Sequence, residues 1–424
     1  MHVRTPLREL VEAEARRAKD AVAALDDERV EVVLRRAAAL TRERGAEIIE
    51  VNGADCEGAA GTLDEGALDR LRLTPGRVET MAAQLDATAA IAPLAREVGE
   101  WTLPNGLRVS ERLVPIGVVG ATFEARPNVV LDIAAQLLKS LNAAVLRTGS
   151  AALATATFLV DGVLRRALTD ADLPADAVGL VRTPDREGAR ILVSLPGLVP
   201  LVIVRGSGET TAALARLAAE NGVGALAHAE GGGVLYVHTD ASRERTVAIA
   251  EASLDRLGVC NRLNLALIDR GALRLLPDLL AVFARAGLEV RATERALELA
   301  PEARPLEEPL GHEWANDPEH VATVTLDLVD GIDEAVRLAN EETSGLAAGI
   351  VTDDTEAANR FLAGYRGTTA FWHAPTRFAD GYELTGVPET GISVAWTPGP
   401  RGPVTYRDLC LRQYRIVGDA TQTR

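Results

Sequence analysis

The stretch Pro115-Ile116-Gly117-Val118-Val119-Gly120-Ala121-Thr122-Phe123 decides the fold, because a short apolar run rich in β-branched residues is typical of a buried strand. A helical pattern at 128–140 follows it, and a second apolar run at 143–146 follows the helix. Strand, helix and strand in this order predict parallel strands joined by a crossover helix. The stretch therefore predicts an open, doubly wound α/β domain.

The same alternation continues on both sides of residue 232. A chain of 424 residues is longer than one core usually holds, and the alternation at 234–350 predicts a second α/β domain. Before the first strand, Asn105-Gly106 predicts a hairpin turn between short alternating segments. The tail at 396–424 is strand-like after a break of Pro and Gly and would suit an oligomer contact.

Composition and charge favour a small-molecule substrate. The net charge of −16 disfavours nucleic acid and anionic membranes as binding partners, since both bind basic patches. An anionic substrate would then need local positive charge in its pocket. Lysine is rare, with Lys19 and Lys139 the two present, which makes Lys139 a residue of interest. The six histidines show no metal-binding spacing, and no metal is expected.

The cysteine count bears on location. Cys56, Cys260 and Cys410 are three residues without motif spacing, which indicates a reducing compartment. The N-terminus has no apolar segment of the secretory type, and the longest apolar run is broken by prolines and too short to span a bilayer. A cytoplasmic location is expected.

Cys260 is the first candidate functional residue. It follows Gly258-Val259 and precedes a polar Asn-Arg pair, so it is expected at an element boundary, where a nucleophilic thiol is accessible. The alternative is a buried cysteine that packs as a small hydrophobe.

Polar residues at predicted strand ends are further candidates. Arg126 and Asn128 follow the first strand. Arg126 would hold an anionic group of the substrate, and Asn128 would donate to an oxyanion. The alternative for Asn128 is that it only caps its helix. Arg147 and Ser150 follow the second strand and would take the ribose phosphate of an NADP-type cofactor, unless Arg147 is a surface residue.

Glycine clusters are the last candidates. The G-x-G-x-x-G fingerprint is absent. Gly206 and the run Gly231-Gly232-Gly233 would let backbone approach a phosphate or a nicotinamide, although such glycines are often only turns.

Taken in order, these stretches resemble the γ-glutamyl phosphate reductase (glutamate-5-semialdehyde dehydrogenase) family of the aldehyde dehydrogenase superfamily. The similar segments are spread over nearly the whole chain: 101–106, 115–120, 123–129, 138–140, 142–147, 149–150, 185–187, 258–261, 333–335, 350–352, 376–381 and 391–393.

The resemblance implies an aldehyde dehydrogenase-like fold. Expected are a doubly wound cofactor-binding domain, a second α/β catalytic domain, a segment that returns to the cofactor domain, and a small oligomerisation arm. The cofactor-binding domain is expected at 1–100 and 114–232, and the catalytic domain at 233–372. The returning segment is expected at 373–395, and the oligomerisation arm at 101–113 and 396–424.

The resemblance also implies an activity, the NADPH-dependent reduction of L-glutamyl 5-phosphate, or a close analogue, to glutamate 5-semialdehyde in proline biosynthesis. Cys260 would be the nucleophile that forms a thioester, with the oxyanion on its backbone N–H and on Asn128. The other implied roles are cofactor contacts for Arg147, Gly149, Ser150, Gly206 and Gly232, and substrate contacts for Arg126, Arg377 and Asn261. The enzyme is expected to be a dimer or tetramer.

The chain departs from the family pattern at three places. Gly206-Ser207 stands where the family has Gly-Gly, Gly233-Val234 where it has Cys-His, and 382–390 replaces a glycine-rich loop. A relative with an altered substrate in a specialised pathway is therefore one alternative. Oxidation of a semialdehyde to an acid with Glu230 as base is a second, and a scaffold that lost turnover is a third.

Overall fold

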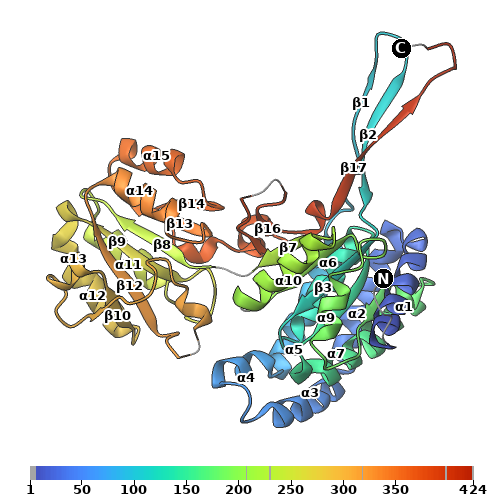
Figure 1. The fold of residues 1–424 in the computed structure, drawn as a ribbon, viewed down its shortest axis with the longest axis horizontal. Coiled ribbons are helices and arrows are strands. Elements are labelled where there is room, and N and C mark those ends of the chain that lie inside the picture. The colour runs from blue at the N-terminus through green and yellow to red at the C-terminus, as the bar shows by residue number, and fades with distance from the viewer. Residues whose placement is uncertain (1–5, 207, 229–230, 318, 397–398, 423–424) are drawn as a thin grey trace. The chain divides into compact units, whose positions relative to one another are not determined.

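The computed structural model describes residues 6–206, 208–228, 231–317, 319–396 and 399–422. The chain forms two compact units. Unit 1 comprises Met1–His228, Val387–Gly391 and Val404–Arg424, and unit 2 comprises Ala229–Gly386 and Ile392–Pro403. Each unit contains its own parallel sheet with helices (Figure 1). The predicted α/β class is therefore confirmed.

The sheet of unit 1 has five parallel strands in the order β5-β4-β3-β6-β7. They are β3 (Val118–Phe123), β4 (Ala143–Thr148), β5 (Val178–Leu180), β6 (Leu201–Arg205) and β7 (Gly224–His228). The chain runs outward from β3 to β5 and returns to the other side of β3 with β6. In doubly wound sheets, the ligand crevice lies at the carboxyl ends of the strands where the order reverses in this way.

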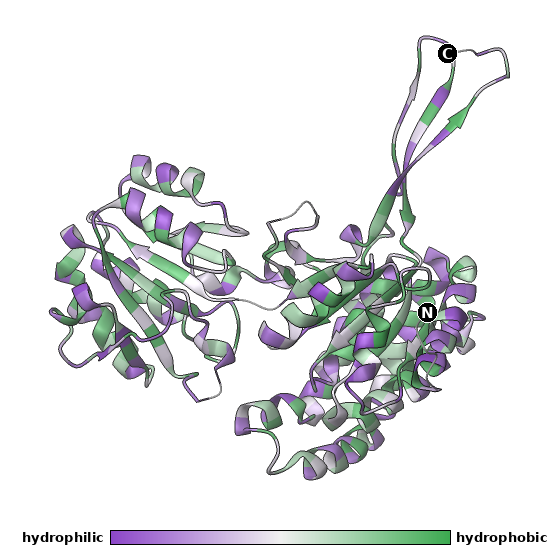
Figure 2. Cartoon of the chain, viewed as in Figure 1, coloured by the Kyte–Doolittle hydropathy of each residue, from purple (hydrophilic) through white to green (hydrophobic). Residues whose placement is uncertain are grey.

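Helices cover both faces of this sheet, because side chains alternate along each strand. On one face Val119, Ala121 and Phe123 belong to the same core cluster as residues of α2, α5 and α6. On the other face, Val118 and Val202 cluster with residues of α1, α9 and α10. The sheet strands are accordingly among the most hydrophobic parts of the chain (Figure 2). The helices of unit 1 are α1 (Pro6–Ala21), α2 (Asp27–Glu43), α3 (Gly45–Ala59), α4 (Glu65–Leu71), α5 (Pro75–Ala90), α6 (Asn128–Lys139), α7 (Leu153–Leu159), α8 (Arg165–Asp170), α9 (Glu187–Leu192) and α10 (Gly208–Glu220).

The sheet of unit 2 has seven parallel strands in the order β11-β10-β12-β9-β8-β13-β14. They are β8 (Gly233–Val237), β9 (Leu263–Asp269), β10 (Glu289–Ala292), β11 (Arg304–Pro305), β12 (Thr323–Val329), β13 (Ala347–Val351) and β14 (Thr369–Trp372). Its helices are α11 (Arg243–Ala252), α12 (Leu276–Arg285), α13 (Glu294–Leu297), α14 (Ile332–Glu341), α15 (Thr355–Gly364) and α16 (Gly381–Thr385). Two buried clusters again lie on opposite faces of the sheet, so this unit is also doubly wound.

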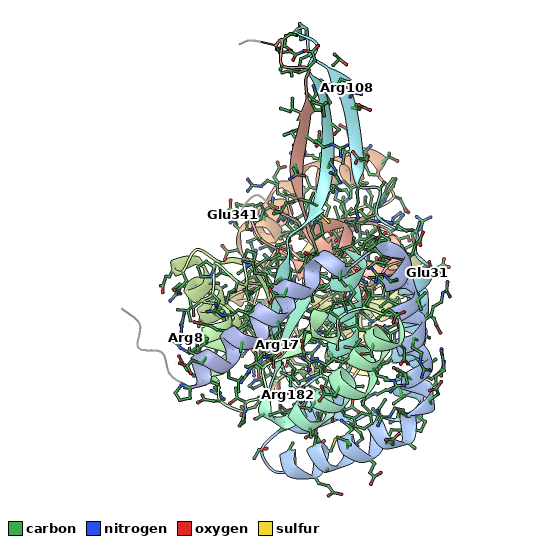
Figure 3. All side chains as sticks on the ribbon, turned by 90° about the vertical axis from the view of Figure 1, so that its right-hand side faces the viewer. Arg8, Arg17, Glu31, Arg108, Arg182 and Glu341 are labelled. Carbon is green, nitrogen blue, oxygen red and sulfur yellow. The ribbon has the colours of Figure 1, made fainter. Side chains whose placement is uncertain are left out.

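Three antiparallel strands form an arm on unit 1: β1 (Glu97–Thr102), β2 (Arg108–Pro115) and β17 (Cys410–Val417) (Figure 1). The predicted Asn-Gly turn joins β1 to β2, with Gly106 at φ +87°. Figure 3 labels Arg108 near the far end of the arm, where it pairs with Val417. Large apolar side chains of the arm are exposed, among them Trp101 and Ile416.

Two short strands, β15 (Gly391–Ser393) and β16 (Gly402–Val404), form a separate two-stranded sheet. None of the helices in the described ranges is both long enough and apolar enough to cross a membrane.

Candidate active site

Cys260 lies in unit 2, in the loop between α11 and β9. Its side chain is partly buried and packs against an apolar cluster that includes Leu346, Phe371 and Ile392. Apolar surroundings exclude water and strengthen electrostatic interactions. Charged groups near this thiol therefore interact with it more strongly than they would in water.

The glycine run 231–233 lies directly against the Cys260 loop. The N–H of Gly232 donates to the Cys260 carbonyl at 2.6 Å, and the N–H of Gly233 donates to the Arg262 carbonyl at 2.7 Å. A β-carbon on Gly231 would come within 2.5 Å of the Cys260 β-carbon. Gly232 has φ +102°, a conformation that favours glycine. The glycines thus allow two segments of the protein to approach each other, and the cofactor contact of Gly232 stays a prediction.

Asn261 and Arg377 form a clamp beside the cysteine. The Asn261 side-chain amide donates to the carbonyls of Arg377 at 3.0 Å and Ala379 at 3.1 Å. Its oxygen accepts a hydrogen bond from the Arg377 guanidinium, which also pairs with Asp255 at 2.6 Å. The structure therefore brings two of the three predicted substrate residues together. Since both amide hydrogens of Asn261 are used on backbone, its role within unit 2 is to hold the turn at 376–379 against the Cys260 loop.

A bulge in β9 attaches a distant loop to this site. Gly233 pairs with Leu263 and Val234 pairs with Leu265, so Asn264 is the extra residue in the ladder. Its side chain donates to the His312 carbonyl at 2.7 Å and accepts from the Trp314 N–H at 3.0 Å. Glu313 lies between these two attachment points. The sequence predicts no role for Asn264 or Glu313, because neither the bulge nor a contact this far apart in the chain leaves a local signal.

In unit 1, predicted site residues gather at the carboxyl edge of the sheet. Glu124 follows β3 and Gly206 follows β6, and a β-carbon on Gly206 would lie 3.3 Å from Glu124 Oε1. Gly149 follows β4 and donates its N–H to the Phe123 carbonyl at 3.1 Å. Arg126 is partly buried in the loop that begins with Glu124. These residues therefore surround the point where the strand order reverses.

Asn128 is the first residue of α6 and does not cap it, because Pro127 occupies the N-cap position. Its side-chain amide instead donates to Asp132 Oδ2, one turn along the helix, at 2.9 Å. Burial raises the pKa of Asp132 to about 6; the Asn128 bond and the charge of Arg205 oppose this, and the charge of Glu389 adds to it. One of the two amide hydrogens of Asn128 is thus committed, which fixes the direction of the other.

Arg147 is buried at the end of β4, with 8% of its surface exposed. Its Nη2 donates to the Asp185 carbonyl at 3.2 Å, and its Nε has no hydrogen-bond partner among the described residues. Burial and the nearby Arg186 both lower the pKa of its guanidinium. The hydroxyls of Thr148 and Thr211, in β4 and in the first turn of α10, are also buried without a hydrogen bond to described residues. This edge therefore offers donors to a ligand.

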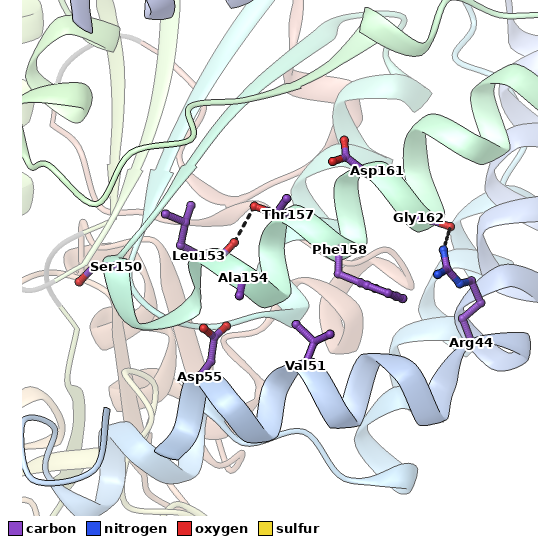
Figure 4. A pocket seen from close by; sticks show the side chains of 10 residues that line it. All are labelled: Arg44, Val51, Asp55, Ser150, Leu153, Ala154, Thr157, Phe158, Asp161 and Gly162. Carbon is purple, nitrogen blue, oxygen red and sulfur yellow. Dashed lines mark hydrogen bonds between the residues drawn. The ribbon is translucent and has the colours of Figure 1, made fainter. Parts of the chain in front are cut away.

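Ser150 is exposed and lies at one end of an open pocket of about 840 Å³ (Figure 4). Val51 and Asp55 of α3 line one side, and Phe158 of α7 lies opposite them. Ser150 is the one predicted site residue among its lining residues, so this pocket extends from the crevice edge along the helices of unit 1.

Residues 7–272 match the model of the aldehyde dehydrogenase family. The chain belongs to this family. Curated relatives are named gamma-glutamyl phosphate reductase: one from Zymomonas mobilis is 35% identical over 89% of this chain and 87% of its own, and one from Opitutus terrae is 39% identical over 84% of each. The crystal structure of gamma-glutamyl phosphate reductase from Thermotoga maritima has a TM-score of 0.88 at 26% identity, covering 99% of this chain and 100% of that one.

This aldehyde dehydrogenase family member carries the predicted site residues on both units. Unit 1 holds Arg126, Asn128, Arg147, Gly149, Ser150 and Gly206, and unit 2 holds Gly232, Cys260, Asn261 and Arg377. Glu230 and Ser207, named in the alternatives above, lie outside the described residues. The predicted family and fold are confirmed, and the individual roles of these residues stay predictions.

Proposed function

We propose that this chain is an NADP-dependent glutamate-5-semialdehyde dehydrogenase that reduces L-glutamyl 5-phosphate to glutamate 5-semialdehyde and phosphate. The observation that carries the proposal is the site of Cys260, a partly buried thiol that a glycine run and an asparagine clamp hold at the start of a central strand. Relatives named for this activity match along most of the chain. The reaction belongs to proline biosynthesis.

Cys260 forms the covalent intermediate. Its sulfur attacks the carbonyl carbon of the acyl phosphate, a C–S bond forms, and the C–O bond to phosphate breaks with its electron pair on the phosphate. The Cys260 backbone N–H stabilises the developing oxyanion. Asn128, whose side chain Asp132 keeps in one orientation, is the proposed catalytic residue of unit 1. Reduction of the thioester releases the aldehyde and the thiolate.

The cofactor binds at the carboxyl edge of unit 1. Its nicotinamide supplies the hydride that reduces the thioester. The buried Nε of Arg147 and the hydroxyls of Thr148 and Thr211 need partners, and phosphate oxygens of a dinucleotide satisfy such donors. Arg147, Gly149 and Ser150 would hold the ribose phosphate of NADP, and Gly206 and Gly232 would allow backbone to approach the cofactor closely.

Substrate recognition uses one basic group in each unit. Arg126 in unit 1 binds an anionic group of the substrate, and Arg377 in unit 2 presents the part of its guanidinium that Asp255 and Asn261 leave available. Asp380 caps α16, which contains the first residues of the altered stretch 382–390, and Tyr382 is 53% exposed. The part of this stretch in unit 2 therefore forms an ordered turn, which would affect the substrate.

One assay separates the candidate activities. Purified protein is incubated with glutamate 5-semialdehyde and NADP, with and without inorganic phosphate, and NADPH is measured. Phosphate-dependent formation of NADPH is the expected result. Formation without phosphate would point instead to oxidation to the acid, and none under either condition would contradict the proposal. Cys260→Ala should lower kcat by about 10⁴-fold or more.

We also propose that the enzyme is a cytoplasmic homo-oligomer. Cys56, Cys260 and Cys410 form no disulfide bond in the described part of the chain, as is usual in a reducing compartment. The exposed apolar side chains of the arm, which include Trp101, Tyr414 and Ile416, suit pairing with a second copy. Light scattering should show a dimer or tetramer, and Ile416→Asp should shift the mass toward that of the monomer.

A further inference from the structure

Glu313 reaches the Cys260 loop from a distant part of unit 2, on a segment held on both sides. The Asn264 side chain bonds the His312 carbonyl and the Trp314 N–H. Trp314 itself is fully buried, and its indole N–H donates to Thr325 Oγ1 at 2.9 Å. The backbone of Glu313 is therefore fixed to β9, which begins directly after the Cys260 loop.

The carboxylate of Glu313 is oriented as well. Asn316 donates its side-chain amide to Oε2 at 2.9 Å, and the other oxygen, Oε1, is buried. A β-carbon on Gly231 would lie 2.4 Å from Glu313 Oε1 and 2.5 Å from the Cys260 β-carbon. Both atoms would contact the same added β-carbon, so Glu313 Oε1 and the Cys260 β-carbon lie near each other. The Cys260 sulfur is bonded to that carbon.

Gly231 is what makes this approach possible. Its carbonyl accepts a hydrogen bond from Ser344 Oγ at 2.8 Å, and the next residue along, Gly232, donates to the Cys260 carbonyl at 2.6 Å. With the backbone held on both sides, the space that a side chain would fill at Gly231 is taken by Glu313 and Cys260 instead. The segment acts as a spacer that brings an acid and a thiol together.

Arg262 is the basic group next to the pair. It is fully buried and donates to the Thr323 carbonyl. Burial lowers the pKa of Arg262 to about 10, and the negative charge of Glu313 opposes that shift. The Glu313 carboxylate is thus electrostatically coupled to a buried group of the site.

Other charged groups around the site have partners of their own. Arg377 pairs with Asp255 at 2.6 Å. On the Glu313 loop, Asp317 bonds His312 at 3.3 Å and His320 at 3.1 Å. Among these groups, Glu313 is the acid that packs against Gly231 and the Cys260 side chain.

We propose that Glu313 is the proton acceptor for the Cys260 thiol. The inference rests on the proposed function and adds the base to it. As the sulfur attacks the acyl phosphate, the S–H proton moves to Glu313, the C–S bond forms, and phosphate leaves with the electron pair of the broken C–O bond. When the aldehyde forms and the thiolate is expelled, the same proton returns to sulfur.

The position of Glu313 has a second effect, of opposite sign, on the resting protein. A negative carboxylate beside a thiol disfavours the thiolate. Glu313→Gln keeps the shape and the bond to Asn316 but removes both the charge and the base. The variant should therefore hold more thiolate at rest and yet transfer the acyl group more slowly. A merely structural role for Glu313 does not produce this split.

The experiment measures both quantities on full-length protein at pH 7. Iodoacetamide labelling of Cys260 is followed by peptide mass spectrometry, which separates it from Cys56 and Cys410, whose thiol pKa values burial raises. Glu313→Gln should be labelled about tenfold faster than wild type. Its kcat with glutamate 5-semialdehyde, NADP and phosphate should fall on the order of 10²-fold.

Glu319→Gln is the matched control, because Glu319 is an exposed residue of the same loop region; it should leave both quantities near wild type. An unchanged kcat in Glu313→Gln would overturn the proposal. A decrease in both the rate of Cys260 labelling and kcat would also overturn it. If wild-type protein does not turn over the semialdehyde at all, the proposed function fails, whereas unchanged labelling of Glu313→Gln contradicts the role of Glu313 by itself.

Discussion

The carboxyl edge of the sheet in unit 1 and the surroundings of Cys260 in unit 2 use their polar groups differently, although Arg262 Nε and Nη1 in the second region are also buried without hydrogen bonds to described residues. At the edge, Arg147 Nε and the hydroxyls of Thr148 and Thr211 are buried without hydrogen bonds to described residues. Around Cys260, the side-chain amides of Asn261 and Asn264 are used on the protein's own backbone. The first region therefore has binding capacity to offer a ligand, and the second is built to hold one reactive group in place.

The substitution expected to have the largest effect is Gly231→Ala, which tests whether the Cys260 loop needs its present geometry. The new methyl group would meet Glu313 Oε1 at 2.4 Å, the Cys260 β-carbon at 2.5 Å and the Cys260 carbonyl at 2.7 Å, so backbone of the loop must move. Because misplacing a catalytic group by about 1 Å can cost 10²-fold, kcat should fall by roughly that factor or more. Steady-state kinetics on the purified variant measures it.

Gly258→Ala is the matched control for that experiment. Gly258 lies in the same loop, and a β-carbon there meets nothing within 4 Å. It should retain nearly all activity. If both substitutions reduced kcat equally, general sensitivity of the loop would explain the result, and the tight fit at Gly231 would not.

Asn261→Ala tests whether the clamp holds the loop. The change removes both bonds to the backbone of the turn at 376–379 and frees the Arg377 guanidinium on one side. Each buried hydrogen bond contributes about 1 kcal/mol, so unfolding should become easier by about 1–3 kcal/mol. Activity should fall about tenfold, mainly through kcat. A variant that changes only the KM of the substrate, with stability unchanged, would instead favour direct substrate binding by Asn261.

Much of the fold follows from local patterns, and the site follows from them only in part. Buried β-branched runs such as Val118–Phe123 and the Asn105-Gly106 turn predict their elements because both signals are short-range. The Glu313–Asn264 attachment depends on a bulge and on residues far apart in the chain, which no local pattern encodes. Lys139 illustrates the same limit: its rarity draws attention to it, yet it is buried and donates to the Ile91 carbonyl at 2.5 Å, beyond the end of α5.

Arg147→Met probes the ligand-facing region. Burial already disfavours the guanidinium charge in the protein alone, so replacing it by an apolar side chain of similar length should leave the cofactor-free protein as stable as wild type or more so. The KM for NADP should rise about tenfold or more, because a charge-assisted bond to phosphate is lost, while kcat changes little. Equal loss of stability and cofactor affinity would show that Arg147 serves the fold and not the ligand.

Asp132→Asn produces the clearest dependence on pH. The folded-state pKa of Asp132, about 6, lies above the ordinary carboxyl value of 3.8, so the folded chain binds more protons than the unfolded chain between these values. Stability attributable to this group is therefore present below about pH 4 and is lost as the pH rises through about 6. The new asparagine at position 132 still offers an oxygen that accepts the hydrogen bond from Asn128, but it carries no charge. Relative to wild type, the variant should gain on the order of 2 kcal/mol in unfolding free energy between pH 4 and pH 7. Calorimetry of both proteins at the two pH values measures this gain, and a difference that does not vary with pH would show that the carboxylate of Asp132 is not strained by burial.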